Sequence, residues 1–122
     1  MRYTLVFLFT IFFIGCTSKQ PIISRGSTII FKTPTMKFYD KGFITRFEDH
    51  IHLQVFEVGQ IALDLQIYKD EVCQTAIECI SSKEFNAKYL HSSYKEDFLY
   101  NLFSQNVIQF KDKQNNILIK VK

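Results

Sequence analysis

Tryptophan is absent from this chain of 122 residues, and glycine is scarce, with only four residues. The glycines stand alone at positions 15, 26, 42 and 59, so the sequence contains no glycine-rich loop of the kind that cradles phosphates. A Gly-x-Ser-x-Gly motif is also missing, which leaves Ser81 and Ser82 without the setting of a hydrolase nucleophile. These absences argue against two large classes of enzyme.

Charge of one sign is not in large excess either. The formal net charge is +3, and Arg2, which lies in a segment expected to be removed, accounts for one unit of it. The lysines are scattered from Lys19 to Lys122 and interleaved with acidic residues, whereas a nucleic-acid footprint needs basic residues clustered on one face. The sequence therefore predicts that the chain has no nucleic-acid partner.

What the sequence does contain is material for one globular domain. Hydrophobic residues make up 47% of the chain and charged residues 22%, which is the ordinary range for a folded protein. We expect a signal segment over residues 1–15, a flexible tether over residues 16–27 and a single domain over residues 28–122.

The N-terminus has the anatomy of a signal peptide. Arg2 is followed by an uncharged run over residues 3–14 and then by Gly15 and Cys16. A helix that crosses the hydrocarbon core needs roughly 20 apolar residues, so a run of about a dozen favours a cleaved signal over a permanent transmembrane anchor.

The stretch Phe13-Ile14-Gly15-Cys16 resembles the lipobox of bacterial lipoproteins, although Phe13 stands where that family commonly has leucine. The resemblance implies cleavage between Gly15 and Cys16 and attachment of diacylglycerol to the Cys16 thiol, with acyl chains that anchor the protein firmly. The alternative is an ordinary secretory signal in which Cys16 is incidental. Thr17 occupies the position where lipoproteins retained in the inner membrane tend to carry Asp. By resemblance, this indicates the periplasmic side of the outer membrane, with the inner membrane and the cell surface as alternatives.

The rest of the chain predicts an α+β fold. Alternation of apolar and polar residues indicates strands near residues 36–39, 43–47, 51–56 and 61–68, with turns at 40–42, 48–50, 58–60 and 69–71. Helices are expected over residues 82–90 and 95–103, the second preceded by capping-box spacing from Ser93 to Glu96. Strand character returns over residues 107–110 and 117–121. We therefore expect an antiparallel β-sheet, with a half-open barrel as one form of it, and one or two helices packed on one face.

Candidate catalytic and metal-binding residues are few. His50 and His52 are two apart and would share one face of a strand, but a metal site needs a further ligand and His91 is the only other histidine. The preferred interpretation places His50 in a turn and His52 on a solvated strand face. Glu57 and Asp64 are single carboxylates without an identifiable partner for acid–base work. The sequence thus predicts neither an enzyme nor a cofactor.

With Cys16 assigned to lipid, Cys73 and Cys79 remain. An even pair of thiols in an oxidising compartment tends to form a disulfide, so we expect one between them at the corner between strand and helix. A redox or metal-binding role is the alternative, although five residues separate the two cysteines where a thioredoxin-like motif has two.

The stretch IHLQVFEVGQIALDLQIYKDEVC, residues 51–73, resembles the central hairpin of LolB-type outer-membrane lipoproteins, with Gly59 and Gln60 in its turn. That family is a half-open antiparallel barrel around an apolar cavity, closed by helices, and it receives the acyl chains of lipoproteins in transit. The resemblance implies a membrane-anchored domain that binds an acyl chain or another lipoprotein. The alternative is a structural or partner-binding lipoprotein with a solid core. The residues expected to line the cavity are Leu53, Val55, Leu63, Leu65, Phe98 and Leu102.

Overall fold

A computed structural model describes residues 23–75 and 77–122; Gly15, Cys16 and the expected signal segment lie outside the described residues. Its eight strands form one antiparallel sheet in the order β6-β5-β4-β3-β2-β1-β8-β7. The strands are β1 (Ile23–Lys32), β2 (Lys37–Arg46), β3 (Ile51–Glu57), β4 (Gln60–Ile67), β5 (Glu71–Gln74), β6 (Glu78–Ser81), β7 (Gln109–Asp112) and β8 (Ile117–Val121).

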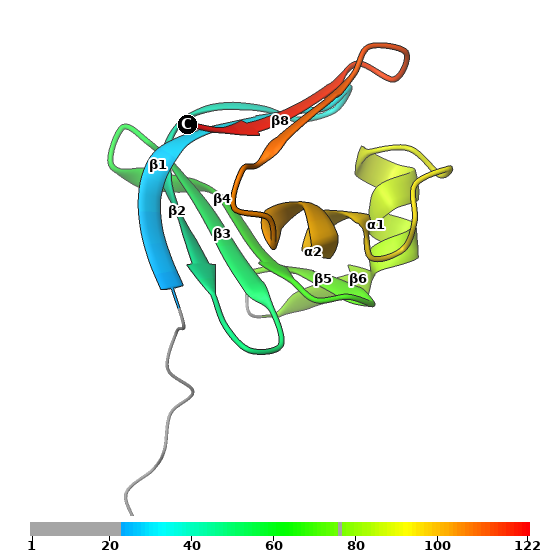
Figure 1. Cartoon of the computed structure of the whole chain (residues 1–122), viewed down its shortest axis with the longest axis horizontal. Coiled ribbons are helices and arrows are strands. Elements are labelled where there is room, and N and C mark those ends of the chain that lie inside the picture. The colour runs from blue at the N-terminus through cyan, green and yellow to red at the C-terminus, as the bar shows by residue number, and fades with distance from the viewer. Residues whose placement is uncertain (1–22, 76) are drawn as a thin grey trace, which may run out of the picture.

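The sheet is open and curls around two short helices, α1 (Ser82–Tyr89) and α2 (Phe98–Phe103), which lie on its concave side (Figure 1). This confirms the expected α+β class, with an antiparallel sheet and helices on one face. Among the described residues, no helix has the length and apolar character needed to span a membrane.

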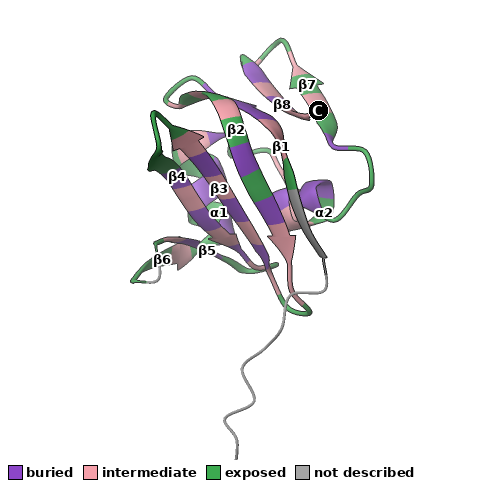
Figure 2. Cartoon of the chain, turned by 90° about the vertical axis from the view of Figure 1, so that its left-hand side faces the viewer, coloured by how far each residue is buried: buried purple, intermediate pink, exposed green. Residues whose placement is uncertain are grey.

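Burial alternates along the central strands, as the period-two pattern predicts. Ile51, Leu53 and Val55 are buried, while the residues between them are only half-buried (Figure 2). Because successive side chains on a strand point to opposite sides, one side of the sheet forms the core and the other faces outward. The apolar side therefore meets the helices.

The domain begins earlier than the expected boundary at Thr28. β1 starts at Ile23, and its first residues pair with the end of β2, from Ile23 opposite Arg46 to Ser27 opposite Gly42. The phenyl ring of Phe43 lies against Gly26, where an added Cβ would be 3.2 Å from the ring. Serine and glycine have weak strand propensity, but pairing with a long neighbouring strand outweighs that preference.

A turn at residues 40–42 was also expected, and this prediction is wrong because β2 runs straight through them. Gly42 is required here by the close approach of its neighbours. A Cβ at this position would lie 2.0 Å from the Gln54 carbonyl oxygen and 2.7 Å from Ile29 Cδ1. Glycine inside a strand marks such a contact as readily as it marks a turn.

The hairpin between β3 and β4 follows the sequence prediction. Val58 and Gly59 form the turn, with φ angles of 52° and 75°. A two-residue hairpin turn of this kind needs positive φ at both positions, which glycine adopts without cost. The turn expected at 48–50 lies between β2 and β3. The turn expected at 69–71 lies between β4 and β5 except for Glu71, which begins β5.

One helix agrees with the expected range and the other is shorter than expected. α1 matches its prediction, and the Ser81 hydroxyl caps it by accepting a hydrogen bond from the Glu84 amide at 3.1 Å. α2 begins only at Phe98, after an N-cap, Asp97, that makes no side-chain capping bond, so the predicted capping box is wrong. The Ser93 hydroxyl instead lies 2.6 Å from His91 Nδ1.

Candidate functional site

The residues expected to line an acyl-chain cavity lie on the concave side of the sheet. Leu53, Val55 and Leu65 are fully buried, and Leu63 is 6% exposed. They belong to the same cluster as the buried apolar residues of the two helices, which are Phe85, Leu99, Leu102 and Phe103. The structure thus brings the strand residues together and fills much of the space in front of them with the chain's own side chains.

Phe98 lies at the margin of this cluster. Its ring centroid is 4.7 Å from that of Tyr94 and 4.8 Å from that of Phe110, so three aromatic rings pack between α2 and β7. Phe98 and Leu102 also line a hollow of about 240 Å³ together with polar residues such as Asn101 and Gln105. Of the six expected residues, these two have access to that small, open hollow.

Leu63 lines a different hollow, of about 430 Å³, which is bordered by the first half of β4 and by the start of β2. Met36, Phe38 and Ile61 form its apolar part, and Asp64 and Gln74 add polar groups. The six expected residues are therefore divided between a buried core and two separate hollows.

A side chain that the sequence did not single out holds α2 in place. Arg46, the last residue of β2, donates a hydrogen bond from Nε to the Phe103 carbonyl oxygen at 3.1 Å and another from Nη2 to the Gln105 carbonyl oxygen at 2.5 Å. The last carbonyl groups of a helix have no partner within the helix, and a cation suits the negative end of its dipole. Arg46 therefore fastens the end of α2 to the sheet.

The three histidines have separate partners. His50 lies in the turn before β3, stacked between Phe47 and Tyr68 at centroid distances of 4.5 and 4.8 Å, and its Nδ1 is 2.7 Å from the Asp49 carboxylate. His91 contacts Ser93. The turn position expected for His50 is confirmed.

His52 has a partner that was not predicted from the sequence. Its Nε2 lies 2.5 Å from Asp64 Oδ1, on the outward side of β3 and β4, and both side chains are about one-quarter exposed. The register places Gln54 opposite Asp64 and His52 opposite Gln66, so the two residues are diagonal neighbours. The contact between His52 and Asp64 could have been predicted only with knowledge of that register.

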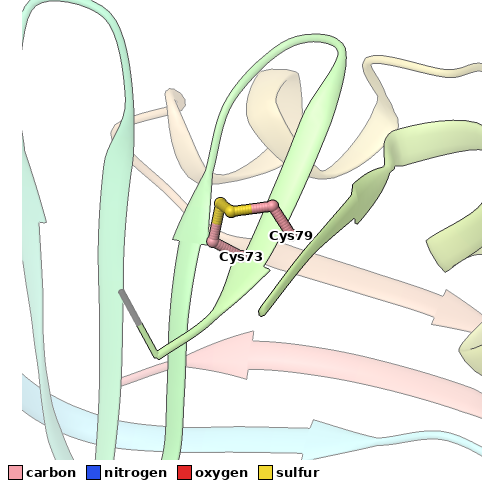
Figure 3. The surroundings of a disulfide bond; sticks show 2 residues. All are labelled: Cys73 and Cys79. Carbon is pink, nitrogen blue, oxygen red and sulfur yellow. A yellow bond between two sulfur atoms is a disulfide. The ribbon is translucent and has the colours of Figure 1, made fainter. Parts of the chain in front are cut away.

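Cys73 and Cys79 form the expected disulfide (Figure 3). The two residues are directly opposite each other in the register of β5 and β6, so the bond staples this hairpin, and α1 starts immediately after it. The carboxylate of Glu71 lies within 4.8 Å of both sulfurs, which are bonded to each other. The disulfide is structural in its placement.

Tyr94 and Asp112 form a polar contact at the margin of the core. The Tyr94 hydroxyl donates a hydrogen bond to Asp112 Oδ2, which also accepts one from Asn115 Nδ2 at 2.8 Å. The hydrogen bond from Tyr94 is the main cause that holds the pKa of Asp112 below its usual value. Burial, followed by this contact, raises the pKa of Tyr94.

The clearest feature missed from the sequence is a gathering of lysines. A hollow of about 630 Å³ lies between the turn that follows β1 and the turn that follows β7. Four lysines line it: Lys32, Lys37, Lys111 and Lys113. They are scattered along the chain, and the pairing of β1 with both β2 and β8 brings them together.

No protein-family model matches this chain, and no curated protein or solved structure matches it either. The resemblance to LolB-type lipoproteins therefore stays a prediction from residues 51–73.

Proposed function

We propose that this chain is a lipoprotein, lipidated at Cys16 and held on the periplasmic side of the outer membrane, whose domain has a solid core and binds a partner through its outer surface. The membrane anchor is proposed from the lipobox-like residues Phe13-Ile14-Gly15-Cys16. The burial of Leu53, Val55 and Leu65 against the helices supports the rest. Because the domain's own helices occupy the concave side of the sheet, the outer surface is the part that can bind a partner. Neither catalysis nor a cofactor forms part of this function.

The anchor is tested by replacing Cys16 with serine. Cells fed a fatty-acid analogue should label the wild-type protein and leave Cys16→Ser unlabelled, and the variant should leave the membrane fraction. A matched control is Cys73→Ala/Cys79→Ala, which removes the other two cysteines and should retain the label. Equal labelling of wild type and Cys16→Ser would contradict the anchor.

The solid core is tested with a fluorescent fatty acid. The mature chain carrying Cys16→Ser should show no saturable binding, since Leu53, Val55 and Leu65 are already buried in one apolar cluster with the side chains of α2. A ligand buried along its length gains about 0.8 kcal/mol per methylene, so real binding in a cavity would be easy to detect. Saturable binding at low micromolar concentration would contradict the solid core.

Acyl-chain binding in a half-open barrel is the second candidate, and the apolar hollow beside Leu63 favours it. The curvature of the open sheet around α2 suits the same architecture (Figure 1). Two matched variants separate the candidates, because Leu63 lines the hollow and Gln66 lies on the outward side of the same strand. If this second candidate is correct, Leu63→Glu abolishes fatty-acid binding and Gln66→Glu preserves it.

A further inference from the structure

A row of lysines crosses four neighbouring strands. The register places Lys37 of β2 opposite Lys32 of β1, Lys32 opposite Leu118 of β8, and Leu118 opposite Lys111 of β7. Residues directly opposite each other in an antiparallel pair point to the same side of the sheet. The three lysines therefore share one side, and they help to line the hollow of about 630 Å³, whose wall also includes Asp112 and the buried Ile117.

That side faces away from the core. The neighbouring row, Phe38, Phe31, Ile119 and Phe110, belongs to the apolar cluster or packs against it, and alternate residues of a strand point in opposite directions. A second outward row adds Lys120, which lies opposite Ile30. In a third, Lys41 lies opposite Thr28, which exchanges backbone hydrogen bonds with Lys122. We define the basic face as Lys32, Lys37, Lys41, Lys111, Lys120 and Lys122.

Acidic side chains do not neutralise this face. Asp40 and Asp112 are the acidic residues of β1, β2, β7 and β8, and they lie opposite the core residues Ile29 and Ile117, on the inward side. Asp112 also borders the hollow between the lysines, where its carboxylate accepts hydrogen bonds from Tyr94 and Asn115. Of the ion pairs between residues that the structure describes, none includes a lysine of the basic face. Two lysines directly across a strand pair, such as Lys32 and Lys37, repel each other. An anionic surface would relieve that repulsion.

Two aromatic rings lie exposed on the same side. Tyr39, opposite Ile30, is 64% exposed, and Phe43, opposite Gly26, is 47% exposed. Phe43 lines a hollow of about 530 Å³ with Phe56, Lys41 and Lys122. Aromatic rings beside lysines suit the boundary between water and lipid, where the ring enters the headgroup layer and the ammonium group meets phosphate.

The expected anchor also brings this face close to a bilayer. Cys16 precedes Ile23, the first residue of β1, by seven positions, which span at most about 25 Å when fully extended. β1 is one of the strands that carry the basic face, and Lys32 is its last residue, nine positions beyond Ile23. A lipid on Cys16 would therefore hold these lysines at a high effective concentration next to the membrane.

We propose that the basic face binds the surface of a bilayer that contains anionic phospholipids, with the lysines on the phosphates and with Tyr39 and Phe43 in the headgroup layer. This deepens the proposed function, since it identifies the membrane itself as the partner of the outer surface. It relies on the anchor for proximity only, because attraction between lysines and anionic lipid does not require acylation.

The test uses the mature chain with Cys16→Ser and vesicles of phosphatidylethanolamine with or without phosphatidylglycerol. Binding is expected only with the anionic lipid and should weaken steeply with salt. Each lysine near an anionic surface is worth about fivefold in binding, so Lys32→Gln/Lys37→Gln/Lys111→Gln should lower the partition coefficient about a hundredfold. The matched control Lys83→Gln/Lys88→Gln/Lys95→Gln makes the same change in net charge near the helices and should have a small effect.

The depth to which the basic face enters the bilayer can be measured by fluorescence quenching. Because the chain lacks tryptophan, Tyr39→Trp supplies a single tryptophan beside the basic face, and Val107→Trp supplies one on an exposed segment before β7. Brominated lipids should quench the first and not the second. The proposal would be overturned if the two triple lysine variants lost binding equally, or if brominated lipids quenched both tryptophans equally. Tighter binding to a single-stranded DNA oligomer than to anionic vesicles would also overturn it. Failure of the anchor is separate, because it appears in the labelling of Cys16 and leaves vesicle binding by Cys16→Ser unchanged.

Discussion

Arg46 and Phe103, 57 positions apart in the chain, are joined by a hydrogen bond from the guanidinium Nε to the carbonyl oxygen at 3.1 Å. A second bond from the same guanidinium reaches the Gln105 carbonyl oxygen. α2 has six residues, too few to be stable in isolation, so contacts with the sheet determine whether it forms.

Replacing Arg46 with methionine should therefore loosen α2. The substitution keeps much of the aliphatic stem and removes both donors, and it should lower the free energy of unfolding by about 2 kcal/mol. Urea denaturation measures that change, and hydrogen exchange should show faster exchange at the amides of α2. Arg46→Lys retains the charge but loses the pair of guanidinium donors, so its free energy of unfolding should lie between those of the wild type and Arg46→Met. A methionine variant as stable as the wild type would contradict this role.

The two glycines that lie in strand β2 and in the β3–β4 turn should respond differently to alanine. At Gly42 an added Cβ would lie 2.0 Å from a backbone oxygen, so Gly42→Ala must displace β3 and should cost about 3 kcal/mol or more. At Gly59 nothing lies within 4 Å of an added Cβ, and only the positive φ of 75° resists, which costs about 1 kcal/mol. Denaturation midpoints rank the pair, and the reverse order would contradict this account.

The central hairpins were predictable because their local signals agree with their environment. β3 alternates between Ile51 and Val55, β4 alternates from Leu63 to Ile67, and over these residues the buried side is the side that the alternation predicts. Near the Val-Gly turn the register shifts and Ile61 is exposed. Ser81 likewise caps α1 through a bond to a residue three positions later. In both cases the information lies within a few neighbouring residues.

The sequence predictions were wrong where contacts with residues distant in the chain determine the local structure. β1 contains serine, arginine and glycine at its start, and it is a strand because β2 pairs with it along ten positions. Gly42 resembles a turn residue until Gln54 is placed beside it. The basic face was missed for the same reason, since Lys32, Lys37 and Lys111 become neighbours only through the order of β2, β1, β8 and β7.

The disulfide between Cys73 and Cys79 should add modest stability. It closes a loop with a sequence separation of six, and a loop of that size contributes roughly 2 kcal/mol through restriction of the unfolded chain. The double variant Cys73→Ala/Cys79→Ala should fold and lose about that amount in urea denaturation. Alkylation without reductant, followed by mass spectrometry, should leave both cysteines of the wild type unmodified. Free alkylation of both would contradict the bond.

The contact between Tyr94 and Asp112 should make stability depend on pH at both extremes. The pKa of Asp112 is lowered in the folded state, chiefly by the Tyr94 hydrogen bond, so its contribution is present above the usual carboxyl pKa of 3.8 and is lost as the pH falls through the folded value. The pKa of Tyr94 is raised above its usual 10.0, chiefly by burial, so its contribution is present below about pH 10 and is lost as the pH rises through the folded value.

Tyr94→Phe separates this contact from all other titrating groups. The variant keeps the ring beside Phe98 and Phe110 and removes the donor to Asp112. Its urea midpoint should lie below that of the wild type near neutral pH, and the two midpoints should converge as the pH falls below 3.8 and as it rises above 10.0. Tyr39→Phe, which removes the hydroxyl of an exposed ring on β2, serves as the matched control and should follow the wild type throughout. A difference between Tyr94→Phe and wild type that stays constant from acid to alkali would show that the hydroxyl acts through packing and that its bond to the Asp112 carboxylate contributes nothing to stability.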